Sequence, residues 1–304
     1  MPEQQTKIIL IAGPTASGKS SLALALSQAI DGEIVNADAM QVYQDLNIVS
    51  ARPSEEETAR VPHHLYGILD GAERCSAGRW ARLATEAIEF IRSRHKVPII
   101  VGGTGLYFRA LTQGLSPIPD VDDQYRARAR ARHEELGPAA FHAEVIERDG
   151  AMDRLPQSDT QRLLRAWEVY EATGKPLSHF QAMTPEPLSN GPFERYVLAP
   201  PRDKLYAACD ARAAAMFEEG AMAEIQTLLA RDLDPNLPVM KALGVPEVAA
   251  YLNGAIPTQD EALAALQQNT RRFAKRQMTW FRNQTADWQV AETAEEILAE
   301  LAGL

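Results

Sequence analysis

The stretch Ile-Ile-Leu-Ile-Ala-Gly-Pro-Thr-Ala-Ser-Gly-Lys-Ser, residues 8–20, decides the fold of this chain. Its five apolar residues predict a buried strand, and Gly13–Ser20 fits the phosphate-binding pattern G-x-x-x-x-G-K-[ST] without a gap. The helix-prone stretch Ser20–Ile30 follows directly. A strand, a glycine-permitted turn and a helix N-terminus together direct backbone N–H groups at one point. The stretch therefore predicts a phosphate site; the alternative is a chance match in a glycine turn.

Each residue of this loop is a candidate phosphate contact. Lys19 would supply a positive charge to the terminal phosphates, and the Ser20 hydroxyl would be a ligand of Mg²⁺. The loop occurs in many nucleotide-binding proteins, so ATP is one candidate ligand. The predicted phosphate-binding residues are Gly13, Pro14, Thr15, Ala16, Ser17, Gly18, Lys19 and Ser20.

Short apolar runs alternate with helical patterns through the first hundred residues. This order predicts an α/β fold, a P-loop NTPase-like parallel sheet with helices on both faces. Ligands bind beyond the carboxyl ends of such strands, so Gly13, Asp38 and Gly102, which each follow a strand, should line one crevice. The predicted strands are Ile8–Ala12, Glu33–Asn36, His64–Leu69 and Pro98–Val101, with helices near Ser20–Ile30 and Ala77–Arg94.

The pattern changes after Gly114, where Ser-Pro-Ile-Pro-Asp (116–120) indicates a linker. Helices are predicted at 124–136, at 139–148, and from Ser158 to about Thr173, where Ser-Asp-Thr-Gln resembles a capping box. A proline-rich stretch (185–192) ends this region, Arg195–Ala199 is another predicted strand, and helices follow to the end. We therefore expect an α/β core at 1–122 and 191–304, the latter with basic C-terminal helices, and a helical insertion domain at 123–190.

Composition sets the broad class of the protein. The 304 residues carry a net charge of −10, which on average is not typical of a nucleic-acid-binding protein. The two cysteines, Cys75 and Cys209, lie far apart without metal-ligand spacing, as in proteins of a reducing compartment. Residues 1–7 are polar, and neither a signal peptide nor a membrane span is evident. We expect a cytoplasmic monomer without membrane contact.

Two polar positions after the predicted strands are candidates for chemistry. Asp38, in Asn-Ala-Asp-Ala-Met-Gln-Val-Tyr (36–43), could hold Mg²⁺, accept a proton from a nucleophile or cap the next turn, and Met40 and Gln41 could contact a flat ring. Gly-Gly-Thr-Gly-Leu-Tyr-Phe (102–108) has glycines and Thr104 where phosphate-loop hydrolases usually place an aspartate for Mg²⁺. This argues against nucleotide hydrolysis, although a plain strand-to-helix turn is the alternative.

Two basic clusters contrast with the acidic chain. Each is either a solvated helix face or a positive stripe for a polyanion. Arg162 and Arg165 extend the first cluster, and their alternative is pairing with Glu168 or other nearby carboxylates, while Gln161 could complete the capping box. The first cluster is Arg126, Arg128, Arg130 and Arg132, and the second is Arg271, Arg272, Lys275, Arg276 and Arg282, interleaved with Phe273, Trp280 and Phe281.

Taken together, these motifs resemble the tRNA dimethylallyltransferase family, also called tRNA isopentenyltransferases. The resemblance covers nearly the whole chain, and the ordered set is far more specific than the phosphate loop alone. It rests on the loop at 13–20, Asp-Ala-Met-Gln-Val-Tyr (38–43), Pro-His-His-Leu (62–65), Gly-Gly-Thr-Gly-Leu-Tyr-Phe (102–108), Gln-Arg-Leu-Leu-Arg-Ala-Trp-Glu-Val (161–169) and Arg-Phe-Ala-Lys-Arg-Gln-Met-Thr-Trp-Phe-Arg (272–282).

The resemblance implies transfer of a dimethylallyl group from dimethylallyl diphosphate to the exocyclic amine of the adenosine 3′ of the anticodon in tRNA. It implies that Asp38 is the general base, that Thr104 lies near the reacting centre, and that Thr15–Ser20, Mg²⁺ and Arg212 bind diphosphate. The insertion and the basic C-terminal helix would grip the anticodon stem-loop. The implied tRNA-binding residues are Asp38, Ala39, Met40, Gln41, Thr104, Arg126, Gln161, Arg162, Leu163, Leu164 and Arg165; to these we add Arg272, Lys275 and Arg276.

The chain departs from the family pattern at two single positions and in one stretch. Ala39 replaces the usual serine after the aspartate, and Ala208 replaces an arginine often found four residues before Arg212. Asn-Ile-Val-Ser-Ala-Arg-Pro (47–53) replaces the commoner Asp-Ile-Gly-Thr-Ala-Lys-Pro. A phosphotransferase, such as a small-molecule or nucleoside kinase that holds ATP, is the main alternative, and an RNA-binding module with a vestigial loop is a third.

Overall fold

The structure is a computed structural model that describes residues 6–185, 187–189 and 191–302. The chain divides into two compact units: Met1–Thr112 with Leu188–Leu304, and Gln113–Pro187. The second unit begins ahead of the expected boundary at residue 123. Ile118 in the proline-containing linker and Val121 directly after it pack into the apolar core of this unit, so the linker belongs to it.

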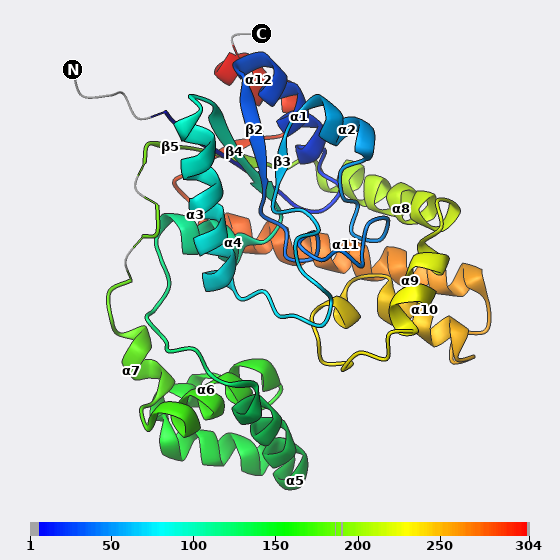
Figure 1. Cartoon of the computed structure of the whole chain (residues 1–304). Helices are drawn as coiled ribbons and strands as arrows, with labels where there is room; N and C mark the ends of the chain where they lie inside the picture. Colours follow the sequence, from blue (N-terminus) through cyan, green and yellow to red (C-terminus); the bar gives the residue numbers. More distant parts are fainter. Residues whose placement is uncertain (1–5, 186, 190, 303–304) are drawn as a thin grey trace. The chain divides into compact units, whose positions relative to one another are not determined.

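A six-stranded parallel sheet lies at the centre of the first unit (Figure 1), in the order β3-β2-β4-β1-β5-β6. Strand β1 has β4 on one side and β5 on the other. After β1 the chain first forms β2, β3 and β4 on one side of it, and then β5 and β6 on the other side. The carboxyl end of a strand at such a switch point is where α/β sheets bind ligands. The predicted fold class is confirmed. The strands are β1 (Ile8–Ala12), β2 (Gly32–Asn36), β3 (His63–His64), β4 (Val97–Gly102), β5 (Phe193–Leu198) and β6 (Gln289–Ala291).

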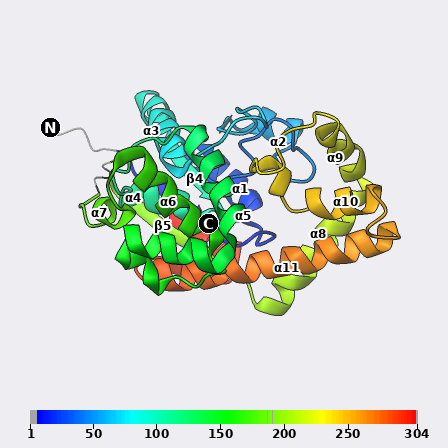
Figure 2. The same ribbon diagram turned by 90° about the horizontal axis from the view of Figure 1, so that it is seen from below.

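Helices cover both faces of this sheet. α1 and α12 pack on one face around Ile11, Leu26 and Ile297, while α3 and α4 pack on the other. α11 runs beside α8 and also contacts α4 and α10 (Figure 2). None of the helices in the described ranges combines the length and apolar character that crossing a bilayer requires. The helices are α1 (Lys19–Ile30), α2 (Glu55–Arg60), α3 (Ala77–Ser93), α4 (Gly105–Thr112), α8 (Arg202–Glu218), α9 (Ala221–Leu229), α10 (Val245–Leu252), α11 (Gln259–Gln284) and α12 (Ala294–Ala302), with a 3₁₀ turn at Val239–Lys241.

Two details of the sheet differ from the sequence prediction. The strand expected at His64–Leu69 is wrong beyond His64, because Leu65 (φ 64°) and Gly67 (φ 57°) turn the chain out of the extended conformation. The short edge strand β6 was not predicted. It has three residues, of which Gln289 and Val290 are exposed, so no buried apolar run marks it.

The second unit is helical, with α5 (Asp123–Arg148), a 3₁₀ turn (Gly150–Arg154), α6 (Thr160–Thr173) and α7 (Leu177–Gln181). The predicted break within residues 124–148 is confirmed: Gly137 is non-helical (φ 73°, ψ 168°) and Pro138 follows. The predicted capping box at Ser158 is wrong, because α6 begins two residues later with Asp159 as its N-cap. Phe141, Val145 and Leu163 form the centre of the unit's own core.

Candidate active site

The phosphate loop joins β1 to α1 and has the backbone that an anion site requires. A Cβ at Gly13 would lie 2.6 Å from the Leu198 carbonyl oxygen, so only glycine fits beside β5. Ala16 (φ 62°) and Gly18 (φ 88°) adopt left-handed conformations. Left-handed residues within a turn make successive N–H groups converge, which forms a concave anion site at the N-terminus of α1.

A cavity of about 410 Å³ lies against this loop. Three cations, Lys19, Arg52 and Arg212, line it, and none of them is ion-paired among the residues that the structure describes. The Ser17 hydroxyl is buried and has no hydrogen-bond partner in the same part of the chain. Unpaired cations and an unsatisfied hydroxyl are costly unless a ligand binds them, and they suit a multiply charged anion.

The electrostatics of the loop favour binding of an anion. Lys19 Nζ donates to the Pro14 carbonyl oxygen at 3.1 Å, within its own loop. Desolvation lowers the pKa of Lys19 to about 8, against the opposing effect of Asp38, and nearby Arg212 lowers it further. Desolvation also lowers the pKa of the Arg212 guanidinium, which donates to the Thr15 hydroxyl. A bound diphosphate would stabilise both charges.

The residues at this cavity fit a divalent cation bound together with phosphates. Ser20 presents a hydroxyl, a hard oxygen ligand, at the first turn of α1. No group of three or more His, Cys, Asp or Glu side chains that could hold a metal occurs in the described ranges. Mg²⁺ commonly keeps few protein ligands and completes its shell with water and substrate phosphates. The donor set suits that mode of binding.

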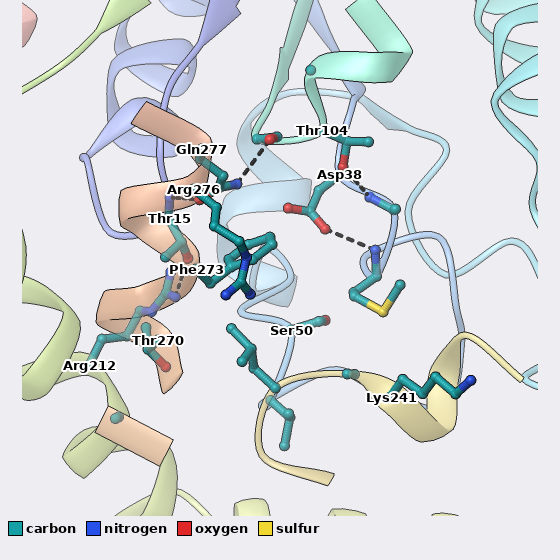
Figure 3. A pocket seen from close by; sticks show the side chains of 18 of the residues that line it. Thr15, Asp38, Ser50, Thr104, Arg212, Lys241, Thr270, Phe273, Arg276 and Gln277 are labelled. Carbon is teal, nitrogen blue, oxygen red and sulfur yellow. Dashed lines mark hydrogen bonds between the residues drawn. The ribbon is translucent and has the colours of Figure 1, made fainter. Parts of the chain in front are cut away.

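Asp38 follows β2 and is fixed by its neighbours. The buried Asn36 side chain accepts from the Asp38 N–H at 2.7 Å and donates to the Asp38 carbonyl oxygen at 3.0 Å. One carboxylate oxygen, Oδ1, accepts from the Met40 N–H at 2.9 Å, which is the turn-capping contact considered above. Figure 3 shows the carboxylate facing the pocket, so the side chain that caps the turn through Oδ1 also lines the cavity.

The Gly102–Gly105 loop lies close to the phosphate loop and to the loop that carries Asp38. The Thr104 hydroxyl accepts from the Ala39 N–H at 2.9 Å, and the Thr104 N–H donates to the Ala37 carbonyl oxygen at 3.1 Å. A Cβ at Gly102 would lie 2.1 Å from that same carbonyl oxygen. The glycines therefore allow close backbone approach, and Thr104 lies beside Asp38 as the predicted crevice required.

A second cavity of about 520 Å³ lies at the carboxyl edge of the sheet and shares Arg212 with the first. Asp38 and Thr104 line one wall, and α11 lines the opposite wall (Figure 3). Its surface is mostly apolar with a few polar groups, as is usual for sites that hold an organic ligand. The lining includes Thr15, Ala39, Met40, Val49, Ser50, Leu106, Met216, Leu243, Leu266, Thr270, Phe273, Arg276, Gln277 and Trp280.

Gln277 is a site residue that the sequence prediction missed. Its side chain is buried and accepts from the Thr15 N–H at 2.8 Å, while it donates to the Gly103 carbonyl oxygen at 2.9 Å (Figure 3). It thus joins the phosphate loop to the loop that carries Thr104. Nothing in the sequence marked this uncharged residue within a basic cluster as a site residue, apart from its position in the stretch 272–282. Arg52, in the departing stretch 47–53, was missed as well.

The predicted tRNA-binding residues fall into different environments. Met40 lines the larger cavity, whereas the Gln41 amide donates to the Ser50 and Ala51 carbonyl oxygens at 2.9 and 2.7 Å. On α11, Arg272, Lys275 and Arg276 are exposed, and the Arg276 guanidinium lies 5.6 Å from the Phe273 ring centre.

Within the helical unit, many of the predicted cations are paired with carboxylates. Arg126 contacts Asp123 and Glu168, and Arg165 contacts Glu168, the pairing considered above as the alternative. Gln161 and Arg162 are exposed on the first turn of α6, and Leu164 is partly buried. Leu163 is fully buried in the unit's core, so its side chain packs and does not face solvent.

Comparison with known proteins settles the family. The family model described as IPP transferase matches residues 41–284, and the one described as Isopentenyl transferase matches residues 6–66. The chain belongs to the IPP transferase family. A tRNA dimethylallyltransferase of Phenylobacterium zucineum is 53% identical over 93% of this chain and 92% of its own. One of Parvibaculum lavamentivorans is 50% identical over 99% of this chain and 96% of its own.

Solved structures of IPP transferases share the fold. The tRNA isopentenylpyrophosphate transferase of Bacillus halodurans is 33% identical with a TM-score of 0.69, over 98% of this chain and 96% of its own. A eukaryotic dimethylallyltransferase, crystallised acting on tRNA, is 26% identical with a TM-score of 0.78, over 98% of this chain and 77% of its own. These relatives are named as dimethylallyl- or isopentenylpyrophosphate transferases and not as phosphotransferases, which does not favour the kinase alternative.

Proposed function

We propose that this IPP transferase transfers a dimethylallyl group from dimethylallyl diphosphate to the exocyclic amine of the adenosine 3′-adjacent to the anticodon in tRNA. The observation that carries the proposal is the arrangement of the two cavities. One is lined by the phosphate loop and by cations without an ion-pair partner among the described residues. The other is lined by Asp38 and apolar side chains, and Arg212 lines both. A diphosphate in the first cavity would leave its isoprenoid tail in the second.

The phosphate loop serves the leaving group in this reaction. As the bond between the allylic carbon and the diphosphate oxygen breaks, the electron pair stays with the diphosphate. Converging N–H groups, Lys19 and Arg212 stabilise the developing charge where it forms. Mg²⁺ bound beside Ser20 would supply further charge stabilisation, and we propose Mg²⁺ as the divalent cation on its fit to hydroxyl, water and phosphate oxygens.

Asp38 serves the nucleophile. The adenine amine is weakly nucleophilic because its lone pair is delocalised into the ring. As the new bond from nitrogen to the allylic carbon forms, the amine proton passes to the free oxygen of Asp38, which is worth roughly 10²–10⁴-fold in rate. The Thr104 hydroxyl and the Ala39 N–H hold this edge of the site together.

The acceptor base must leave its stack to reach Asp38. An enzyme that modifies a base extrudes it into a pocket, and sequence-specific RNA recognition mostly targets single-stranded loops. Met40, Phe273 and Trp280 in the cavity wall suit stacking against a flat ring. We propose that the exposed cations of α11 and the polar face of the helical unit contact the anticodon stem-loop.

The assembly and compartment belong to the same proposal. A single chain supplies the phosphate loop, Asp38 and Arg212 to the two cavities, so the proposed reaction does not require a second copy, and we propose an active monomer. Cys75 and Cys209 are free thiols, which supports a reducing compartment such as the cytoplasm.

A direct assay tests the function. The protein is incubated with dimethylallyl diphosphate, Mg²⁺ and an anticodon stem-loop RNA, and the digested RNA is analysed by mass spectrometry. We expect prenylated adenosine and one diphosphate released per transfer. Absence of prenylated adenosine would overturn the proposal, and ATP-dependent phosphorylation of a small acceptor would instead establish the kinase.

A further inference from the structure

Arg52 contributes a cation to the phosphate-loop cavity from outside the phosphate loop. It lies in the connection between β2 and α2, and it lines the cavity together with Lys19, Ser20 and Arg212. Neither the comparison with relatives nor the phosphate-loop pattern at Gly13–Ser20 assigns a role to Arg52.

The charge of Arg52 has no carboxylate partner within the described ranges. Its Nη1 group donates to the carbonyl oxygens of Tyr43 and Gln44 at 3.3 and 3.4 Å, both long for such bonds. Its Nε group is buried and unpartnered among the same residues. Glu57, on the same cavity, accepts from the Ser54 N–H at 2.8 Å as a helix cap. A partly buried guanidinium without an anion is costly, so a ligand anion would stabilise it.

The surrounding fold fixes the position of Arg52. The Glu224 carboxylate accepts from three successive N–H groups, those of Asn47, Ile48 and Val49, at 2.7, 2.9 and 2.8 Å. The Arg52 N–H donates to the Asn47 carbonyl oxygen at 3.0 Å. The guanidinium lies against Gly67, whose φ of 57° favours glycine, and a Cβ there would lie 2.4 Å from Arg52 Nη1. These backbone hydrogen bonds fix the main chain at Arg52, so its side chain starts from a fixed point beside the cavity.

We propose that Arg52 is a further diphosphate-binding residue, which contacts the donor's phosphates from the wall opposite the phosphate loop. This inference rests on the function proposed above. Position 208 lines the same cavity one helical turn before Arg212, but Ala208 has no charge to offer. The commoner family pattern has a lysine at position 52, and in this chain Arg52 supplies the third cation of the cavity, after Lys19 and Arg212. Its fork of N–H groups binds phosphate oxygens and neutralises the diphosphate as it departs.

The test separates phosphate binding from catalysis. The affinity for inorganic pyrophosphate with Mg²⁺, without tRNA or isoprenoid, is measured by isothermal titration calorimetry for wild type, Arg52→Ala and Arg52→Lys. The comparison uses variants whose melting temperature equals that of wild type. We expect about a 10- to 100-fold loss of pyrophosphate affinity in Arg52→Ala and a smaller loss in Arg52→Lys, the range for a charge-assisted hydrogen bond. In turnover, KM for dimethylallyl diphosphate should rise to a similar degree, with KM for tRNA unchanged within about twofold.

Two further variants make the result specific. Arg60→Ala removes an exposed cation that pairs with Glu56 and does not line the cavity, so its pyrophosphate affinity should equal that of wild type. Adding Ala208→Arg to Arg52→Ala should restore part of the lost affinity. Wild-type affinity in Arg52→Ala, or an equal loss in Arg60→Ala, would overturn the proposal. Failure of the proposed function itself would show separately, as absence of prenylated adenosine with wild-type protein.

Discussion

At the scale of single residues, the site combines one positioned carboxylate with cations that have no ion-pair partner in the part of the chain that the structure describes. Asp38 has one oxygen engaged by the Met40 N–H and faces the cavity, so its geometry is fixed without both oxygens being consumed. Lys19 and Arg212 have lowered pKa values because burial disfavours their charged forms. Perturbed groups of this kind are typical of functional sites.

Replacing Asp38 by asparagine tests the base. In Asp38→Asn, the amide oxygen of the new side chain can still accept from the Met40 N–H, so the turn should persist while proton acceptance is lost. We expect single-turnover prenylation to fall roughly 10²–10⁴-fold. Affinity for tRNA, measured by filter binding, should change by less than about threefold, because the substitution preserves shape. Near wild-type turnover in Asp38→Asn would remove this residue as the base.

The pKa of Lys19 predicts a pH dependence. Its ordinary value of 10.5 is lowered to about 8, so the residue loses its charge as pH rises through about 8. Only the protonated form attracts diphosphate. We therefore expect kcat/KM for the donor, which reports the free enzyme, to be highest below pH 8 and to fall above it by about tenfold per unit. The decline should be absent in Lys19→Met, whose activity should be low throughout; a decline retained in that variant would assign it to another group.

At the scale of elements, α11 organises the site. Gln277 joins the phosphate loop to the Gly103 loop, and a Cβ at Gly105 would lie 2.2 Å from the Trp280 ring. The helix therefore packs directly against both loops, and its buried stripe, not its charged face, positions them.

Removing the Gln277 bridge should affect stability and turnover together. In Gln277→Leu, the Thr15 N–H and the Gly103 carbonyl oxygen lose their partner, and each unsatisfied group costs about 1–3 kcal/mol. We expect a lower free energy of unfolding in urea and a lower kcat, because the donor loop and the Thr104 loop are no longer tied. Gln267→Leu is the matched control, since Gln267 bonds the Asp210 carbonyl oxygen on α8 and lines neither cavity. It should lose stability but keep kcat; equal kcat in both variants would contradict the positioning role.

At the scale of the whole molecule, the chain consists of two units, each with its own apolar core. Its net charge of −10 does not exclude local clusters of exposed cations. In the helical unit, many arginines are paired with carboxylates, as Arg128 is with Glu171 and Arg132 with Glu144. On α11, the exposed cations Arg272, Lys275 and Arg276 form no ion pair among the described residues.

This difference in ion pairing predicts which cations contribute to the salt dependence of tRNA binding. Log affinity for tRNA should fall linearly with log salt concentration despite the acidic chain, because phosphate contacts release counterions. Neutralising Arg272, Lys275 and Arg276 to Gln should reduce the slope by about 0.7–0.9 for each residue that contacts a phosphate. Neutralising Lys7 and Lys96, which pair with Glu194 and Asp31, should leave it unchanged. A slope unaffected by the triple substitution would mean that α11 is ordinary surface.

The sequence by itself determined the features that depend on neighbouring residues. The phosphate loop, the order of strands and helices, and the break at Gly137–Pro138 follow from glycine conformations, apolar runs and proline chemistry over a few residues. These features were enough to place Asp38 and Thr104 at one edge of the sheet. Short-range patterns failed where the backbone turned unexpectedly, as at Leu65 and Gly67.

Only the tertiary structure decided which distant residues meet. Gln277 reaches Thr15 across 262 positions, and the 47–53 loop brings Arg52 to the phosphate cavity. The tertiary structure also decided that Leu163 is a core residue, although Leu163 lies in a segment that we expected to contact tRNA. Local composition carries no information on such pairings, because burial, ion pairing and desolvation depend on what the folded chain places beside each side chain.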